Sequence, residues 1–179
     1  DEDLSRGLGD VYKRQPMRLE IRKKQAQNTI FENNRKLKLV VPCQNEKDKD
    51  ELIYKEFMAY KFFEELSDIH LKTQAVSLKI IELKNGKEIE HNMFAFLVED
   101  DNKVADRHAI KKYPSRRMSP LAVKDSSAIN FTLFSYMIGN TDWSLAYQHN
   151  TEMFFDGKRM IAVPYDFDHS GLVLSLIHI

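Results

Sequence analysis

The stretch from residue 139 to residue 171 restricts the fold more than any other part of the chain. Within it, two short apolar runs flank the dipeptide Asp156-Gly157. Apolar residues that alternate around an Asp-Gly pair predict a β-hairpin with a tight type I′ turn, because this dipeptide tolerates positive φ angles. Such a hairpin brings its two ends together. The chain is therefore expected to contain antiparallel β-structure that gathers the residues before and after the hairpin.

Residues with oxygen-bearing side chains stand on both sides of this hairpin: Asp142, Asn150, Asp166 and Asp168. Carboxylate and amide oxygens are hard ligands, which suit Mg²⁺. In phosphoryl transfer one Asp orients the attacking hydroxyl while others hold the metal. The stretch therefore indicates a magnesium-dependent site, and the simpler alternative is that acidic residues cluster in turns.

Composition excludes several classes of protein. The chain has 179 residues, which fits one domain or slightly more, and 42% are hydrophobic, which is enough for a packed core. With 27 basic and 27 acidic residues, net charge gives no indication of nucleic acid or an anionic membrane as partner. The single Cys43 excludes an internal disulfide and a cysteine-based metal cluster. The sequence contains no run of 18 or more apolar residues, so no membrane-spanning helix is predicted. This composition is compatible with a cytoplasmic protein and with an exported one.

Both ends of the chain resemble translated sequencing-adapter DNA, as found at the ends of metagenomic fragments. The segments are LSRGLGDVYKRQ at residues 4–15 and LSLIHI at residues 174–179. On this interpretation residues 1–15 and 174–179 are artefacts, and the expected biological part is a bacterial fragment over residues 16–173. The alternative is that both segments are native tails.

Residues 35–42 predict a half-buried strand, because apolar and polar side chains alternate along it. Its lysines, Lys36 and Lys38, share one face with Val40. They are either solvated, or one of them binds a phosphate as a compact point charge. Residues 17–31 are interpreted as a strand that runs into a loop.

Residues 50–66 predict a helix, because apolar residues recur at three- and four-residue spacing. Glu56 lies on or beside the apolar stripe of this helix, where an unpaired carboxylate is costly. A lysine on the neighbouring strand would relieve that cost. Alternatively, Glu56 lies at the margin of the stripe and reaches water.

A second hairpin is predicted over residues 74–98, around the turn dipeptide Asn85-Gly86. Its second strand runs into Glu99-Asp100-Asp101, which is either a connection between two lobes or an ordinary change from strand to loop. Residues 101–124 are polar and basic and are interpreted as a loop with short helical pieces. Their basic run is interpreted as a solvated face, and the alternative is a site for an acidic substrate.

A second helix is predicted over residues 125–138, with Asp125 or Ser126 as its N-cap and Gly139 as its C-terminal cap residue. It leads directly into the GNTDW segment that contains Asp142.

The order of these parts is that of a protein kinase: strand with Lys, helix with Glu, hairpin, connector, helix, Asp and Asn, hairpin, Asp-Phe-Asp. Residues 16–173 resemble the CotH-type atypical kinases, named for the spore-coat kinase, and more distantly the HipA-like kinases. The matching segments are NTIFENNRKLKLV, YKEFMAYKFFEEL, FAFLVED, FSYMIGNTDWS, HN and VPYDFDHSG.

The resemblance implies an α+β fold, a truncated protein-kinase-like arrangement of two lobes. Residues 16–100 would form a small lobe of antiparallel sheet and helix, and residues 101–173 would begin a helical large lobe. It implies transfer of a phosphoryl group from ATP, with Mg²⁺, to a hydroxyl acceptor, a Ser or Thr of a protein. A catalytically dead binding module and a small-molecule kinase are the alternatives, and the fragment alone is expected to be inactive.

The resemblance also assigns roles to residues of the expected small lobe. Lys38 would contact the α- and β-phosphates of ATP, with Lys36 on the same face as second choice, and Glu56 would pair with the lysine. Glu99 and Asp100 would lie at the connector beside the adenine pocket.

In the expected large lobe, Asp142 would accept or orient the proton of the substrate hydroxyl. Asn150 and Asp166 would hold Mg²⁺ with help from Asp168, and His149 would orient the loop. The chain departs from the kinase pattern in two respects. It has no glycine-rich phosphate loop before the lysine strand, and the eight positions from Asp142 to Asn150 exceed the spacing of the protein-kinase catalytic loop.

Overall fold

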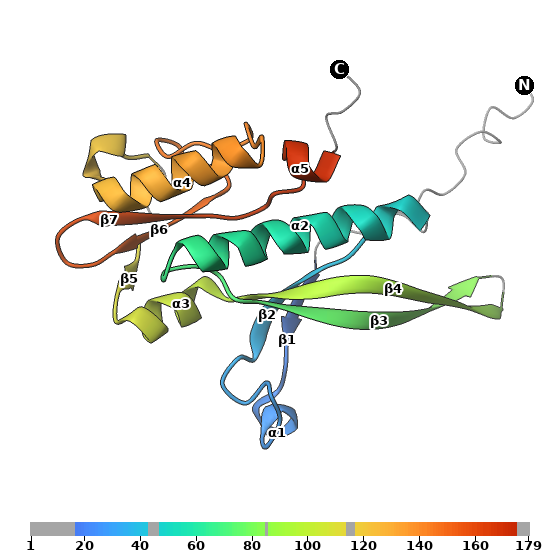
Figure 1. Cartoon of the computed structure of the whole chain (residues 1–179). Coiled ribbons are helices and arrows are strands. Elements are labelled where there is room, and N and C mark those ends of the chain that lie inside the picture. The colour runs from blue at the N-terminus through green and yellow to red at the C-terminus, as the bar shows by residue number, and fades with distance from the viewer. Residues whose placement is uncertain (1–16, 43–46, 85, 114–116, 175–179) are drawn as a thin grey trace, which may run out of the picture.

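The computed structural model describes residues 17–42, 47–84, 86–113 and 117–174 (Figure 1). The fold is α+β, with one four-stranded antiparallel sheet of order β1-β2-β4-β3 and one three-stranded sheet of order β5-β6-β7. The elements follow in the order β1 (Met17–Glu20), α1 (Lys23–Ala26), β2 (Lys36–Val40), α2 (Lys47–Leu66), β3 (Thr73–Lys84), β4 (Lys87–Glu99), α3 (Asp101–His108), β5 (Lys111–Lys112), the 3₁₀ helix η1 (Pro120–Ala122), α4 (Asp125–Met137), β6 (Thr151–Phe155), β7 (Met160–Pro164) and α5 (Gly171–Leu174).

The predicted hairpin of residues 74–98 is confirmed as strands β3 and β4. Lys84 pairs with Lys87, so only two residues form the turn, and Gly86 has the positive φ of 74° that such a turn requires. Asn85 lies outside the described residues. This hairpin is longer than its neighbours, because β2 pairs with β4 only from Phe96 to Glu99. Its distal half therefore extends beyond the rest of the sheet (Figure 1).

The hairpin around Asp156-Gly157 is also confirmed, but the prediction of a two-residue type I′ turn is wrong. The last pair of the ladder is Phe155 with Met160, so residues 156–159 form a four-residue loop. The Oδ1 atom of Asp156 accepts hydrogen bonds from the backbone N–H groups of Lys158 and Arg159, both at 2.8 Å. These bonds hold the Asp156 pKa below its usual value. The aspartate thus closes a longer loop through its side chain.

The alternation predicted for residues 35–42 places the two faces of β2 against different groups of residues. Leu39 and Val41 pack in one apolar cluster with Ala95 and Leu97 of β4. Val40 belongs to the other cluster, which faces α2. Lys36 and Lys38 share the face of Val40, since strand residues two apart point to the same side.

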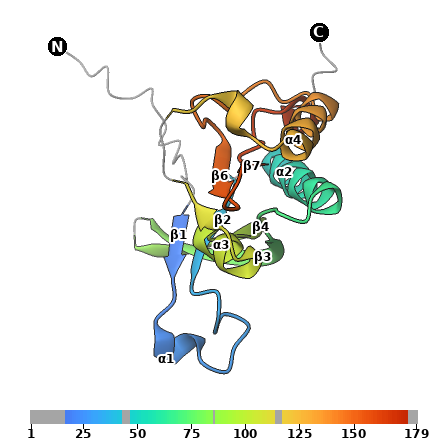
Figure 2. The same cartoon turned by 90° about the vertical axis from the view of Figure 1, so that its left-hand side faces the viewer.

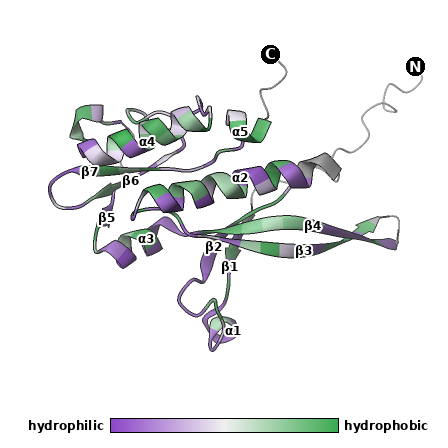
Figure 3. Ribbon diagram, viewed as in Figure 1, coloured by the Kyte–Doolittle hydropathy of each residue, from purple (hydrophilic) through white to green (hydrophobic). Residues whose placement is uncertain are grey.

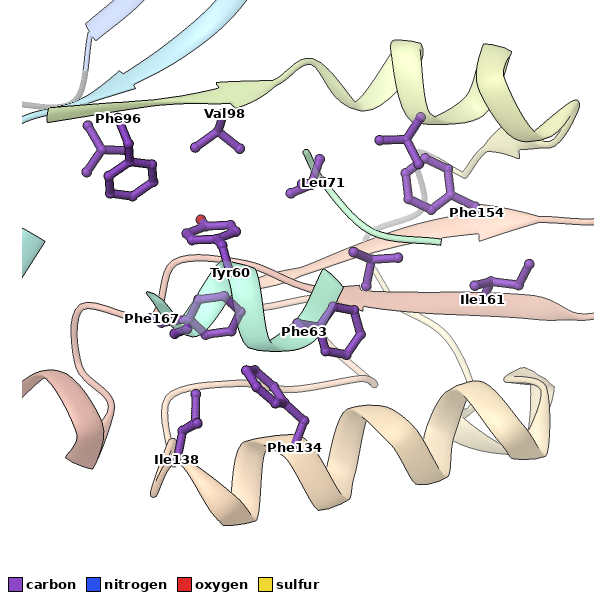
Figure 4. Close-up of a cluster of buried hydrophobic side chains, with 14 of the residues drawn as sticks. Tyr60, Phe63, Leu71, Phe96, Val98, Phe134, Ile138, Phe154, Ile161 and Phe167 are labelled. Atoms are coloured by element: carbon purple, nitrogen blue, oxygen red, sulfur yellow. The ribbon is translucent and has the colours of Figure 1, made fainter. Parts of the chain in front are cut away.

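Helix α2 lies between the four-stranded sheet and the C-terminal part of the chain (Figures 1 and 2). Its Tyr60 ring packs on Phe96 of β4 with centroids 5.5 Å apart, and its Phe63 ring packs on Phe134 of α4 at 5.1 Å. Phe167 lies between Tyr60 and Phe134, at 4.8 and 5.5 Å (Figure 4). One hydrophobic core therefore contains residues from both predicted lobes.

Figure 3 shows apolar residues along β6, β7 and the part of β4 beside α2, whereas the segment around α1 is mainly hydrophilic. The short helix α1 interrupts residues 17–31, where only a strand and a loop were predicted. The segment around α1 extends away from the packed layers (Figures 1 and 2).

Helix α3 is regular over eight residues, where short helical pieces in a loop were predicted. The side chain of Asp100 caps it, because Oδ1 accepts the backbone N–H of Asn102 at 3.0 Å. Among the described helices none is of the length and apolar character needed to cross a membrane.

Helix α4 confirms the prediction for residues 125–138, but the predicted N-cap is wrong. The N-cap residue is Lys124, which makes no side-chain capping bond, and Asp125 already lies within the helix. The start is set by the sheet, because the N–H of Lys124 donates to the carbonyl of Met160 at 2.7 Å. At the other end Gly139 has a φ of 62°, as the predicted C-terminal cap requires.

Replacing Phe63 by Ala should lower the free energy of unfolding by about 3–5 kcal/mol, because the change leaves a cavity in the core. The side chain is only 3% exposed and packs on Phe134. Urea denaturation followed by circular dichroism measures the loss.

Phe62→Ala is the matched control, since it makes the same chemical change at the adjacent position of α2, where the ring is 46% exposed. It should cost less than about 1 kcal/mol. Equal losses in the two variants would contradict the placement of α2 against α4.

Candidate functional site

A backbone contact fixes the loop that follows α4. The N–H of Gly171 donates to the carbonyl of Gly139 at 3.0 Å, and the N–H of Leu172 donates to Ile138 at 2.9 Å. A Cβ atom at Gly139 would lie 3.4 Å from Cα of Gly171. The start of the Asp142 loop is therefore held against the start of α5, directly after the Asp-Phe-Asp segment.

The Asp142 carboxylate is held from two sides. Nε2 of His149 lies 2.8 Å from its Oδ1, and Nδ2 of Asn150 donates to its Oδ2 at 3.1 Å. The same Asn150 nitrogen donates to the Asp142 backbone carbonyl at 2.8 Å, while the Asp142 N–H donates to Oδ1 of Asn140 at 3.0 Å. The side chain is 41% exposed. The arrangement fixes the carboxylate in one orientation and leaves it open to an approaching group.

Three residues of the site have positive φ angles although none is glycine: Gln148 at 53°, Asn150 at 48° and Asp166 at 62°. Such conformations cost about 1–3 kcal/mol each and persist where surrounding contacts enforce them, commonly at functional sites. Here the enforcing contacts include the bonds of Asn150 to Asp142 and the donation of the Asp166 N–H to the hydroxyl of Tyr60 at 2.9 Å.

Hairpin β6–β7 brings Asn150 and Asp166 to the same end of the sheet, as the sequence predicted. Thr151 pairs with Pro164, and the N–H of Tyr165 donates to the carbonyl of Asn150 at 3.2 Å. Asp166 follows directly, and its Oδ1 lies 3.7 Å from Nζ of Lys38. The β2 lysine and the aspartate after β7 therefore meet across the molecule.

Glu56 is buried, with 2% of its surface exposed, which excludes the alternative that it reaches water. Burial, reinforced by the charges of Asp166 and Asp168, raises its pKa to about 8, although Lys38 and a hydrogen bond from the Phe167 backbone oppose the rise. Its Oε1 has no hydrogen-bond partner among the described atoms. Near pH 7 the carboxyl group is therefore mostly protonated.

The expected pairing of Glu56 with Lys38 is not formed in the structure. Among the described ion pairs Lys38 has Asp166 as its partner, and none joins it to Glu56. A neutral carboxyl group attracts an ammonium group less than a carboxylate does. Lys38 also lies 5.8 Å above the ring of Tyr165.

The carboxylates of the site repel one another. Burial raises the Asp168 pKa, and the charges of Asp166 and Asp142 raise it further, with His169 opposing. Within the described part of the chain no group of three or more His, Cys, Asp or Glu side chains is placed to hold a metal ion. The donor set nevertheless has the chemistry that Mg²⁺ prefers, since a cation would relieve the repulsion of these carboxylates.

A cavity of about 410 Å³ opens beside Lys38, between the sheet and the segment of Tyr165. Its lining includes Val98 and the residues that connect β4 to α3. Glu99, expected beside the adenine pocket, lines this cavity. Its carboxylate accepts from Arg107 at 2.9 Å and from the backbone N–H of Lys72 at 3.1 Å.

Asp100 and Lys36 also border this cavity, but their side chains already have partners. The Asp100 carboxylate caps α3. The Lys36 ammonium lies 3.9 Å from Glu20, and the side chain is 66% exposed. Of the two lysines, Lys38 is the better placed to contact a ligand near Asp166.

The sequence did not indicate a charged cluster in the wall of the same cavity. Lys112 of β5 pairs with Asp101 of α3 and, at 3.4 Å, with Glu152 of β6. Burial lowers the Lys112 pKa, but the hydrogen bond to Asp101 and the charge of Glu152 raise it to a net value above normal. Lys112 belongs to a basic run that was interpreted as solvated, and only the pairing of β5 with β6 distinguishes it.

Replacing Glu56 by Gln should remove a pH dependence of stability. Because the native pKa of about 8 lies above the ordinary 4.5, the folded wild type binds more protons than the unfolded chain between these values. Its free energy of unfolding therefore falls as pH rises through this window. The free energy of unfolding of Glu56→Gln minus that of wild type should therefore rise by about 1.4 kcal/mol per pH unit between about pH 5 and 7.5. Urea denaturation at a series of pH values measures this difference.

Glu65→Gln is the control, because Glu65 is exposed on the same helix. The difference in free energy of unfolding between Glu65→Gln and wild type should stay constant over the same pH range. A constant difference for Glu56→Gln as well would show that Glu56 does not hold a proton in the folded protein.

The site is interpreted from its geometry and from its order along the chain. Comparison of the chain with protein-family models, with curated proteins and with solved structures finds no match.

Proposed function

We propose that the chain is a kinase-like domain that transfers a phosphoryl group from Mg-ATP to a hydroxyl acceptor. The observation that carries the proposal is the ion pair of Lys38, which lines the cavity, with Asp166. The Asp142 carboxylate, whose charge acts on Asp168, is held by His149 and Asn150. Phosphoryl transfer depends on positioning and on neutralising charge, and these residues can do both. The resemblance to CotH-type kinases favours a Ser or Thr of a protein as acceptor.

The order of the elements supports this proposal. Lys38 lies on a strand and Glu56 on the following helix, and a hairpin then leads through α3, β5 and η1 to α4. The Asp142 loop and the hairpin that ends before Asp166 follow. In protein kinases a strand lysine, a helix glutamate, a catalytic-loop aspartate and a metal-binding aspartate occur in this order.

Asp142 is the residue that interacts with the hydroxyl group of the acceptor. Its two hydrogen-bonded neighbours hold the carboxylate in place, and its partial exposure lets a hydroxyl group approach. A carboxylate in this role accepts or orients the proton of the hydroxyl group without needing a high pKa. His149 and Asn150 act through Asp142 and are positioning residues.

Asp166, Asp168 and the side-chain oxygen of Asn150 would hold Mg²⁺, since the Asn150 nitrogen is already bonded to Asp142. When bound, the metal neutralises the charge that develops on the phosphoryl oxygens. Lys38 would bind phosphate oxygens as a point charge. Its ion pair with Asp166, at 3.7 Å, supports a role for both groups at one small ligand.

A second function, a catalytically dead binding module, has one observation in its favour. Active protein kinases need the ion pair between the strand lysine and the helix glutamate. Here Glu56 is protonated near neutral pH and Lys38 pairs with Asp166. Nucleotide binding without phosphate transfer would support this alternative.

Two substitutions separate binding from transfer. Asp166→Asn removes a metal ligand and should weaken Mg-ATP binding at least about tenfold, which is about 1.4 kcal/mol. Asp142→Asn should leave Mg-ATP affinity near that of wild type, and it should slow any transfer that the wild-type chain carries out about 10²–10⁴-fold. Titration calorimetry with and without Mg²⁺ measures binding of ATP. Incorporation of label from γ-labelled ATP into a Ser/Thr-rich protein measures transfer.

Asp106→Asn serves as control, because Asp106 lies on α3 with its side chain 72% exposed. It should change neither quantity. The proposal would be wrong if the wild-type chain and the Asp166 variant bound Mg-ATP equally, or if wild type did not bind it.

A further inference from the structure

The cavity side of the sheet carries a pair of facing cations. In the register of β1 and β2, Arg18 stands directly opposite Lys38, and Lys38 stands opposite Val98 of β4. Residues directly opposite one another point to the same face of a sheet. Val98 belongs to the core that faces α2, and the cavity lining includes Arg18, Lys38 and Val98. Arg18 and Lys38 therefore share the cavity face.

Like charges directly opposite each other on two strands are destabilising unless something compensates them. The other cations of this face have acidic partners: Lys36 pairs with Glu20 at 3.9 Å and Lys38 with Asp166 at 3.7 Å. Arg18 is exposed, and no described acidic side chain forms an ion pair with it. The face therefore presents an uncompensated guanidinium group next to Lys38.

The chain also lacks the backbone device that usually binds phosphates at such a place. Between Gly9 and Gly86 there is no glycine, so β1, β2 and their connection contain no glycine-rich loop. Such loops bind phosphate oxygens through successive backbone N–H groups. A guanidinium group offers five N–H donors in a planar fork that matches phosphate oxygens.

We propose that Arg18 and Lys38 form a phosphate-binding pair that takes the place of a glycine-rich loop. Arg18 binds phosphate oxygens through two N–H groups, and Lys38 contributes a point charge on the neighbouring strand. An anion between them removes the repulsion of the two cations. The assignment of the anion to a nucleoside triphosphate rests on the proposed function, whereas the pair itself follows from the register of β1 and β2.

The test compares Arg18→Gln with Arg22→Gln, an exposed arginine that lies outside the cavity lining. Titration calorimetry measures the affinity of each folded chain for Mg-ATP, for inorganic tripolyphosphate and for adenosine. Arg18→Gln should weaken Mg-ATP and tripolyphosphate at least about tenfold and leave adenosine unchanged, because only the charged groups lose a partner. Arg22→Gln should change none of the three. Arg18→Lys, which keeps the charge without the fork, should lie between wild type and Arg18→Gln.

The outcomes separate the two proposals. Unchanged Mg-ATP and tripolyphosphate affinity in Arg18→Gln would overturn the phosphate pair and leave the kinase function standing. An equal loss for adenosine would also overturn it, because Arg18 would then contact the base. If wild type bound tripolyphosphate through Arg18 but not Mg-ATP, the pair would stand and the proposed function would fail. A wild-type chain that bound none of the probes would overturn both.

Discussion

The ring of Phe167 connects the acidic residues of the candidate site to the hydrophobic core. It is fully buried between Tyr60 of α2 and Phe134 of α4. Because Asp166 and Asp168 are its immediate neighbours in the chain, the packing of this one ring limits where both carboxylates can lie. The hydroxyl of Tyr60 adds a second restraint, since it accepts the N–H of Asp166. The geometry of the site therefore depends on apolar packing that is remote from solvent.

Electrostatics explains how the charged residues around this ring are paired. Glu56 lies beneath the Asp-Phe-Asp segment, where burial and two neighbouring aspartates favour its protonated form. Among the described residues, Lys38 forms its ion pair with Asp166 and none with Glu56. The lysine is therefore held at the wall of the cavity, beside Tyr165. The main cation of the site thus lies beside the aspartate that follows β7 and not beside the glutamate of α2.

Local sequence patterns predicted most of the secondary structure. Alternation and turn dipeptides located both hairpins, and Gly139 marked the end of α4, because these features depend on residues close together in the chain. The errors arose where distant residues decide. The bond from Lys124 to the distant Met160 sets the start of α4. The loop of residues 156–159 is an exception, because there the Asp156 side chain selects a longer loop through bonds to residues two and three positions along the chain.

The candidate site was predictable where it depends on local patterns and not where it depends on residues distant in the chain. The hairpin brought Asn150 and Asp166 together as expected, because its register follows from alternation. The partner of Lys38 could not be predicted, since it depends on the burial of Glu56 by other elements. The position of Lys112 was not predicted either, because β5 is too short to show a pattern of alternation. The kinase-like interpretation itself stays a prediction from the order of the parts.

The length of the β3–β4 hairpin has a consequence for local motion. Over residues 87–95 the described strand β4 has β3 as its neighbour but not β2, and an isolated two-stranded ribbon is marginally stable in water. Two cross-strand contacts restrain this half, Lys79 with Glu90 at 2.7 Å and His91 with Glu82 at 2.9 Å. Amide protons near the tip should therefore exchange with solvent by fraying of the ribbon alone. Those beside α2 exchange only when the larger core opens, so the sheet contains two separate units of cooperativity.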